Sequence, residues 1–296
     1  MALGVLNNIA AIYAENNLNS TQSSLQTTLQ QLSSGSRINS GADDAAGLSL
    51  ANGLQANAAA LTQSATNAGE GVGLLQVADG ALSQVTNLLN RAVTLATEAS
   101  NGTLNNSQLS AADSEYQSIL DEISNIGSTT SYNGQAAFGG TFQIFTGDGS
   151  ASGTSTDTLS FAALSSANVG DPAGSAGLAY AAGAITYTPG TGEDLSATNL
   201  TSNANASTAL TDVYTAIQDV AAERGYIGSQ INTLNAVSNV ESTEQTNVTS
   251  AENSIMATDY ASATSNLSKF EILSQTGISA LAQANSMQQM VTKLLQ

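Results

Sequence analysis

Long heptad patterns of apolar residues constrain the fold of this chain more than any other feature. In the front half, one register runs from Ala58 to Ala96, with polar interruptions at Asp79 and Thr86. In the back half, a second register runs from Leu210 to Leu234 and is interrupted by Arg224. Heptads sustained over this length are typical of coiled-coil-like bundles. We therefore predict long helices that pack side by side.

The two prolines of the chain, Pro172 and Pro189, both lie between these helical regions. The stretch around them predicts β structure instead. Asn133-Gly134 favours a type I′ turn, and residues 142–144 and 159–161 alternate apolar and polar side chains, as a hairpin with a turn at 147–157 does. Residues 185–187 form a further short strand at most, and 171–207 has a loop-like composition. The predicted fold class is mainly α: a long antiparallel coiled-coil-like helical bundle with a small β-hairpin region in the middle.

Both ends of the chain carry apolar stripes of their own, from Leu18 to Leu32 and from Leu267 to Leu294. Short isolated helices are marginal in water, so neither stripe is expected to stay folded alone. We predict a monomer that is folded from about residue 44 to 255 and disordered at both ends until they meet partners.

The residue types that are missing exclude several classes of function. The chain has 296 residues, no His, no Cys and a net charge of −18. It therefore lacks the usual zinc ligands, a His-based triad, a thiol nucleophile and any disulfide, and its negative charge argues against nucleic-acid binding. We predict no enzyme activity, no catalytic, cofactor or metal site, and no membrane span. Residues 1–14 lack the basic start of a cleavable signal, so none is expected.

Two kinds of motif allow a chemical and a structural interpretation. The glycines of residues 69–73 resemble a phosphate-binding loop, but they lie inside a heptad pattern, so we favour close packing of helices there. Acidic pairs at Asp43-Asp44, Asp113/Glu115 and Asp121-Glu122 lack the spacing of a calcium loop, and we favour solvated helix faces.

Asp79 and Arg224 place opposite charges in otherwise apolar seams. If the two long helices are antiparallel and start near residues 45 and 256, equal rise per residue places 79 opposite about 222. We predict that Asp79 and Arg224 form a structural pair. The alternative is two independent residues that lean toward the surface.

Signatures at both ends of the chain resemble those of bacterial flagellin. The N-terminal ones are Leu32-Ser33-Ser34-Gly35-Ser36-Arg37-Ile38-Asn39-Ser40, Ala42-Asp43-Asp44-Ala45-Ala46-Gly47, and the segment from Ala81 to Thr103. The C-terminal ones are Thr258-Asp259-Tyr260-Ala261, Asn266-Leu267-Ser268-Lys269, and the segment from Ile278 to Asn285. The resemblance covers residues 1 to about 140 and about 205 to 296.

The resemblance implies a secreted structural subunit that polymerises with copies of itself into the flagellar filament for swimming. Its implied domains are an N-terminal inner-tube helix (1–43), an outer-tube helical domain with a hairpin (44–170 and 206–256), a short variable loop region (171–205) and a C-terminal inner-tube helix (257–296). It also implies type III export, an export chaperone that binds residues 257–296, and hook-associated and cap proteins as partners. A hook–filament junction protein is the alternative.

Flagellins of many bacteria are recognised by an animal Toll-like receptor. The contact motif of the family aligns with Asn90 to Leu95 and with Glu115. The predicted heptad register turns Arg91 and Leu95 outward, one helical turn apart. The resemblance therefore implies a receptor-facing surface at Arg91, Leu95 and Glu115, or alternatively a contact with a neighbouring subunit.

Overall fold

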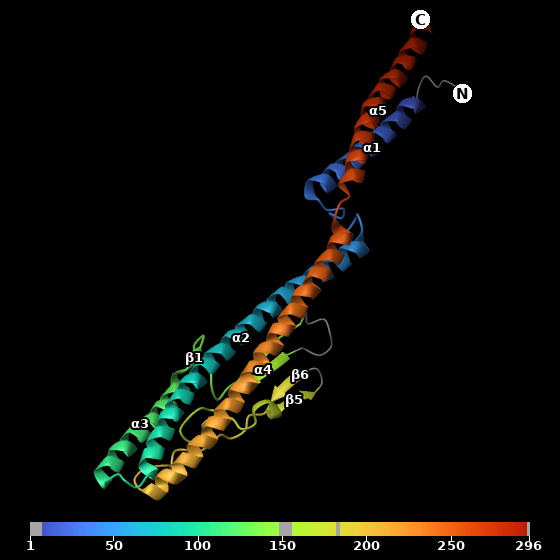
Figure 1. Ribbon diagram of the computed structural model, residues 1–296. Helices are drawn as coiled ribbons and strands as arrows, with labels where there is room; N and C mark the ends of the chain where they lie inside the picture. Colours follow the sequence, from blue (N-terminus) through green and yellow to red (C-terminus); the bar gives the residue numbers. More distant parts are fainter. Residues whose placement is uncertain (1–7, 148–155, 182–183, 295–296) are drawn as a thin grey trace. The chain divides into compact units, whose positions relative to one another are not determined.

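The computed structural model describes residues 8–147, 156–181 and 184–294, and within these ranges the chain is mainly α-helical (Figure 1). The helices are α1 (Ile9–Ser34), α2 (Ala45–Ser100), α3 (Asn106–Thr129), α4 (Asn203–Met256) and α5 (Tyr260–Leu294). The chain divides into two compact units. The central unit comprises residues 57–247, and the terminal unit comprises the residues before and after it. The predicted fold class is confirmed.

Within the central unit, α2 and α4 lie side by side and run antiparallel. In the hydrogen bonds between the two helices, the residue numbers increase along α2 as they decrease along α4. The pairs are Thr62 with Gln245, Ser64 with Glu241, Asp79 with Arg224, and Ser100 with Asn203. α3 follows α2 after a turn at Gly102, and the side chains of Asn105 and Gln108 form a capping box at its start.

The buried seam of both long helices differs from the predicted one by one position in each repeat. Each predicted heptad has two core positions. The first, which holds Leu61, Leu75, Leu82 and Leu89 in α2, is fully buried. The second, which holds Asp79 in α2 and Arg224 in α4, is only half-buried in both helices. The buried residues beside the first position are mostly small or polar, with Val85 the exception: Ser64, Gly71, Ala78, Val85, Ala92 and Ala99 in α2, and Ala209, Ala216, Glu223 and Gln230 in α4. Small side chains allow close packing but give no strong hydrophobic signal.

The middle of the chain forms two small sheets. β1 (Ser131–Tyr132) and β2 (Gln135–Ala136) pair around Asn133 and Gly134, both of which have positive φ, as the predicted type I′ turn requires. The predicted hairpin is also confirmed, since β3 (Thr141–Phe145) pairs antiparallel with β4 (Thr156–Ser160). Residues 148–155 of its predicted turn lie outside the described residues.

The stretch predicted as a loop with at most one strand contributes two strands. β5 (Leu178–Ala181) and β6 (Ala184–Tyr187) extend the hairpin to a sheet of order β3-β4-β6-β5, in which β6 is parallel to β4. The partner of β6 comes from more than twenty residues earlier in the chain, so no local turn signal reveals the pairing. The few aromatic residues join this sheet to α4, with Phe161 edge-on to Phe138, Phe142 and Tyr226.

In the terminal unit, α1 and α5 run antiparallel and pack on each other. α1 ends at Gly35, whose φ of 72° stops the helix. The Asn8 side chain donates to the Ala284 carbonyl, and Thr258 donates to the Gln31 carbonyl at the other end of the pair. Each terminal stripe therefore has part of the other as a partner within the molecule, whereas Leu29, Leu273 and Met290 of these stripes stay exposed. The expectation that the two ends become ordered only with further partners stays a prediction. The side chains of Val291 and Leu294 lie outside the described set.

Candidate functional site

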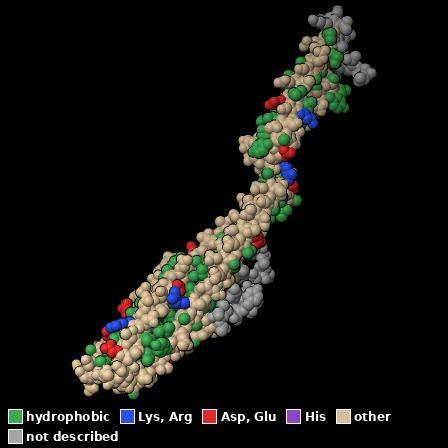
Figure 2. Space-filling view, viewed as in Figure 1, with side chains coloured by type: hydrophobic (Ala, Val, Ile, Leu, Met, Phe, Trp, Pro, Cys, Tyr) green, Lys and Arg blue, Asp and Glu red, His purple; other side chains and the backbone are tan. Residues whose placement is uncertain are grey.

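The α1–α5 pair leaves most of its large apolar side chains exposed. Among the described residues, thirteen large hydrophobic side chains are exposed, and all but Tyr214 and Val240 belong to the terminal unit. Those on the two terminal helices are Ile9, Ile12, Tyr13, Leu29, Tyr260, Ile272, Leu273, Ile278, Met287 and Met290. We call these ten residues the terminal apolar surface. The space-filling view shows hydrophobic side chains on the outside of these helices (Figure 2).

A narrow seam explains why these side chains stay exposed. The residues that α5 buries or half-buries recur at spacings of three and four: Ala263, Leu267, Phe270, Ser274, Gly277, Leu281 and Ala284. Several are small, and a methyl group added at Gly277 would come within 3.3 Å of Leu18 Cδ1. Each helix therefore uses one thin stripe for its partner and keeps its other apolar residues outside the contact. Exposed apolar area of this kind marks an interaction surface.

The structure brings Asp79 and Arg224 together, as predicted. Arg224 Nε lies 2.7 Å from Asp79 Oδ1, and Arg224 Nη2 donates to Asp79 Oδ2 at 3.3 Å. The side chains retain 37% and 38% exposure for Arg224 and Asp79, because both occupy the half-buried second position of their helices. The pair therefore aligns α2 with α4 at the edge of the seam and keeps contact with water.

Of the three predicted receptor-facing residues, Arg91 and Glu115 are exposed and Leu95 is buried. Arg91 on α2 and Glu115 on α3 form an exposed ion pair, with Arg91 Nη2 2.7 Å from Glu115 Oε1. The prediction that Leu95 points outward is wrong, since it is 3% exposed and belongs to the hydrophobic core. The reason is the shifted register, because α2 buries residues on both sides of the predicted stripe.

The glycine run and the acidic pairs have structural roles. A methyl group at Gly71 would come within 3.0 Å of Leu234 Cδ1, and one at Gly73 within 3.0 Å of the Tyr132 hydroxyl, so these two glycines allow close packing. Gly69 faces open space. Asp44 Oδ1 accepts from the Gly47 amide at the start of α2, and Asp113 accepts from the Leu200 amide. Across the described ranges, no cluster of three acidic side chains could hold a metal ion.

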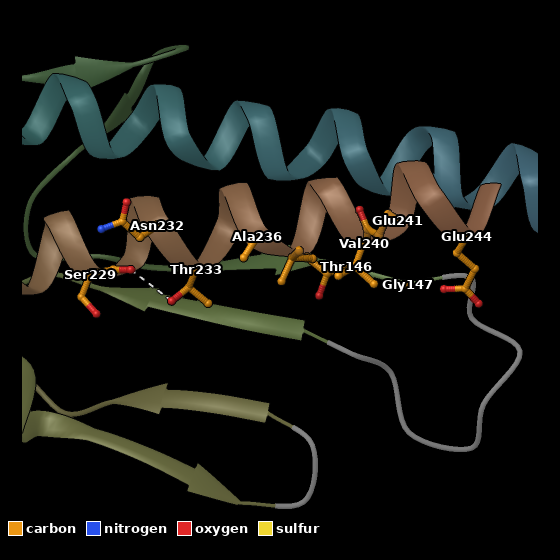
Figure 3. A pocket seen from close by; sticks show the side chains of 10 residues that line it. Thr146, Gly147, Ser229, Asn232, Thr233, Ala236, Val240, Glu241 and Glu244 are labelled. Atoms are coloured by element: carbon orange, nitrogen blue, oxygen red, sulfur yellow. Dashed lines mark hydrogen bonds between the residues drawn. The ribbon is translucent and has the colours of Figure 1, made fainter. Parts of the chain in front are cut away.

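An open hollow of about 650 Å³ lies between the end of β3 and α4 (Figure 3). Its lining residues are Thr146, Gly147, Ser229, Asn232, Thr233, Ala236, Val237, Val240, Glu241 and Glu244. Glu241 is 4% exposed, and its Oε1 accepts from the Ser64 hydroxyl at 2.5 Å. The ionisable groups among these lining residues are the carboxyls of Glu241 and Glu244.

Sequence reasoning missed a buried acidic cluster on the sheet-facing side of α4. Asp171 and Glu223 are 0% and 2% exposed, and Tyr187, at 3%, donates from its hydroxyl to Asp171. Burial and the nearby charge of Asp171 raise the pKa of Glu223 to about 8. Burial likewise raises the pKa of Asp219. Glu223 lies beside the first heptad position, and its burial could have been found only by knowing the register.

Comparisons with known proteins agree with the end signatures. Residues 5–143 match the family described as bacterial flagellin N-terminal helical region, and residues 210–295 match bacterial flagellin C-terminal helical region. Flagellin 1 of Proteus mirabilis is 39% identical over 140 residues, which are 47% of this chain and 38% of that protein. Phase 1 flagellin of Salmonella naestved is 41% identical over 134 residues, 45% of this chain and 26% of that protein.

Each of these matches therefore spans less than two-fifths of the length of the curated relative. Among solved structures, the crystal structure of Bacillus cereus flagellin is similar at 30% identity and a TM-score of 0.45. That similarity covers 59% of this chain and 88% of the other. Among the described helices, none combines the length and the apolar character that crossing a bilayer requires.

Proposed function

Since this chain belongs to the bacterial flagellin family, we propose that it is a structural subunit that polymerises into the flagellar filament for swimming. The observation that carries the proposal is the terminal apolar surface. Fully burying a Leu, Ile or Met side chain contributes about 1.5–3 kcal/mol, so the eight such residues on this helix pair, together with Tyr13 and Tyr260, favour contact with further protein. Copies of the same chain offer the same surface to one another.

Polymerisation of purified chain onto filament seeds tests this proposal. The double variant Ile272→Ser/Ile278→Ser is expected to stay monomeric, because it removes two exposed apolar side chains from α5. The double variant Tyr214→Ser/Val240→Ser is the matched control, since those residues are the exposed large apolar ones among the described side chains of the central unit. Sedimentation and electron microscopy report the polymer.

Long filaments from the wild type and the control, with none from the α5 variant, support the proposal. Equal polymerisation of all three chains would contradict the role of the terminal apolar surface. Short caps or no polymer from the wild-type chain would favour a hook–filament junction protein instead.

The same surface supports the export partners that the family implies. A chaperone that covers residues 257–296 in the cytoplasm would keep the α5 apolar residues from associating early, and the chain would then be exported to the cell surface through the flagellar type III apparatus. Hook-associated and cap proteins would meet the growing polymer at its ends. Replacing Leu273, Met287 and Met290 by Ser in the full chain should weaken chaperone capture, and undiminished capture would refute the assignment.

Recognition by an animal Toll-like receptor would use Arg91 and Glu115 without Leu95 as an exposed anchor. Arg91→Ala should lower the response of reporter cells to the monomer, whereas Arg37→Ala, which removes another exposed arginine, should not. An equal response to both variants would place the contact elsewhere.

A further inference from the structure

Glu223 is a buried carboxyl group in the seam of α4, with no compensating cation. It is 2% exposed, and its Oε1 atom has no hydrogen-bond partner. The next residue, Arg224, is already paired with Asp79. Because an ionised carboxylate buried without a partner is costly, the folded state favours the protonated form of Glu223.

The groups around Glu223 make this preference stronger. Asp171, at the start of the segment that leads to β5, is the charge that acts on it, and Asp171 in turn accepts from the Tyr187 hydroxyl. The other titratable groups of this region are acidic or phenolic: Asp157, Glu193, Asp212, Asp219 and Tyr226. Burial and Asp171 together raise the pKa of Glu223 to about 8.

The same place is where the segment before β5 attaches to α4. The Asp171 amide donates to the Asp219 carbonyl at 3.2 Å. The Asp171 carboxylate accepts from the Tyr187 hydroxyl and from the amides of Ala173 and Gly190, at 2.8 and 2.7 Å. Opening this attachment would expose the carboxyl group of Glu223 to water.

Tyr187 and Gly170 complete the attachment. The Tyr187 ring stacks on the ring of Tyr226, with 3.7 Å between the centroids. Gly170 has φ of 79° and lies so close to the α4 backbone at Val220 that a side chain there would overlap it. Asp219 and Tyr226, which Asp171 and Tyr187 contact, flank Glu223 on one face of α4, so this close packing lies on the face that carries Glu223.

We propose that Glu223 is a pH-sensitive latch: closure of the Asp171–Tyr187 attachment on α4 keeps Glu223 protonated, and opening of this attachment lets it release its proton. The latch is independent of the polymerisation surface. The opened carboxyl has an ordinary pKa near 4.5, whereas the closed one is raised to about 8. The closed state is therefore most favoured below about pH 4.5, loses stability as pH rises between the two values, and changes no further above pH 8.

Hydrogen exchange of the Ala173 and Gly190 amides, corrected for the intrinsic effect of pH, measures the opening. In the wild-type chain, the opening constant should rise by up to about tenfold per pH unit from pH 5.5 to 7.5, because one proton leaves Glu223. Glu223→Gln should lower the slope by about one proton, leaving only the contribution of Asp219 and Glu193. Glu98→Gln removes an equal charge from an exposed site and should keep the wild-type slope.

Equal slopes in the wild type and in Glu223→Gln would overturn the proposal. Infrared spectroscopy gives a second measurement on the folded wild-type chain. The band of a protonated carboxyl group should disappear around pH 8. No such band at pH 6.5 would also overturn the proposal, whether or not the variant folds.

Discussion

The two units of the chain use apolar side chains in opposite ways. In the central unit, a continuous core of buried residues runs from Ala68 to Leu234 through α2, α3, the sheet and α4. In the terminal unit, α1 and α5 share a thin seam and leave ten large apolar residues exposed. The central unit therefore has a core of its own, whereas the terminal unit leaves exposed the apolar surface on which the proposed polymerisation depends. Substitutions confined to one unit test this contrast between a closed core and an exposed surface.

The largest difference in stability is expected between two variants that each remove a large apolar side chain, one from each unit. Leu82 is 0% exposed, so Leu82→Ala should destabilise the monomer by about 2–5 kcal/mol through lost contacts and a cavity. Leu273 is 43% exposed, so Leu273→Ala should change the monomer by no more than about 0.5 kcal/mol. Urea unfolding of the monomer measures both. A large loss for Leu273→Ala would show that the terminal unit has a core of its own.

A smaller effect is expected from glycines inside the central unit. Gly127 of α3 packs against the Leu164 backbone, where a methyl group would overlap the carbonyl oxygen, so Gly127→Ala should cost about 1–3 kcal/mol. Gly225 of α4 faces open space, so Gly225→Ala should instead stabilise the helix by about 0.5–1 kcal/mol. Unfolding midpoints that shift the same way for both variants would contradict the packing described for α3.

The smallest effect is expected from the charge pair at the edge of the central seam. Asp79 and Arg224 are each more than one-third exposed, so solvent screens them and their coupling should be about 0.2–1 kcal/mol. A double-mutant cycle with Asp79→Ala and Arg224→Ala measures the coupling. A value of about 3 kcal/mol or more would show that the pair behaves as a buried one.

The sequence predicts the parts of the fold that large apolar residues and turn residues specify locally. Leu75, Leu82 and Leu89 mark the buried face of α2, and Asn133-Gly134 marks the turn between β1 and β2. The Asp79–Arg224 contact follows from nothing more than equal rise along two antiparallel helices. These features need no knowledge of distant neighbours.

The remaining features depend on neighbours that are far away in the sequence. Leu95 lies among the small buried residues Ala92, Ala96 and Ala99, and Glu223 lies where Gly170 lets another segment approach α4, and a hydrophobic pattern reveals neither. The parallel pairing of β6 with β4 likewise has no local signal. For the terminal apolar surface, the two stripes are visible in the sequence, but the seam of small residues that decides which side chains stay exposed is not.

The antiparallel pairing of α2 with α4 also bears on the order in which the chain can fold. Its contacts are nested: Asn203 bonds Ser100 across 103 residues, Arg224 bonds Asp79 across 145, and Gln245 bonds Thr62 across 183. Closing the innermost pair first leaves only short further loops for the others, so the entropy of loop closure favours zipping outward from the turn between α2 and α3. When the chain emerges with its N-terminus first, α2 therefore lacks most of its packing partner until nearly all of α4 has emerged.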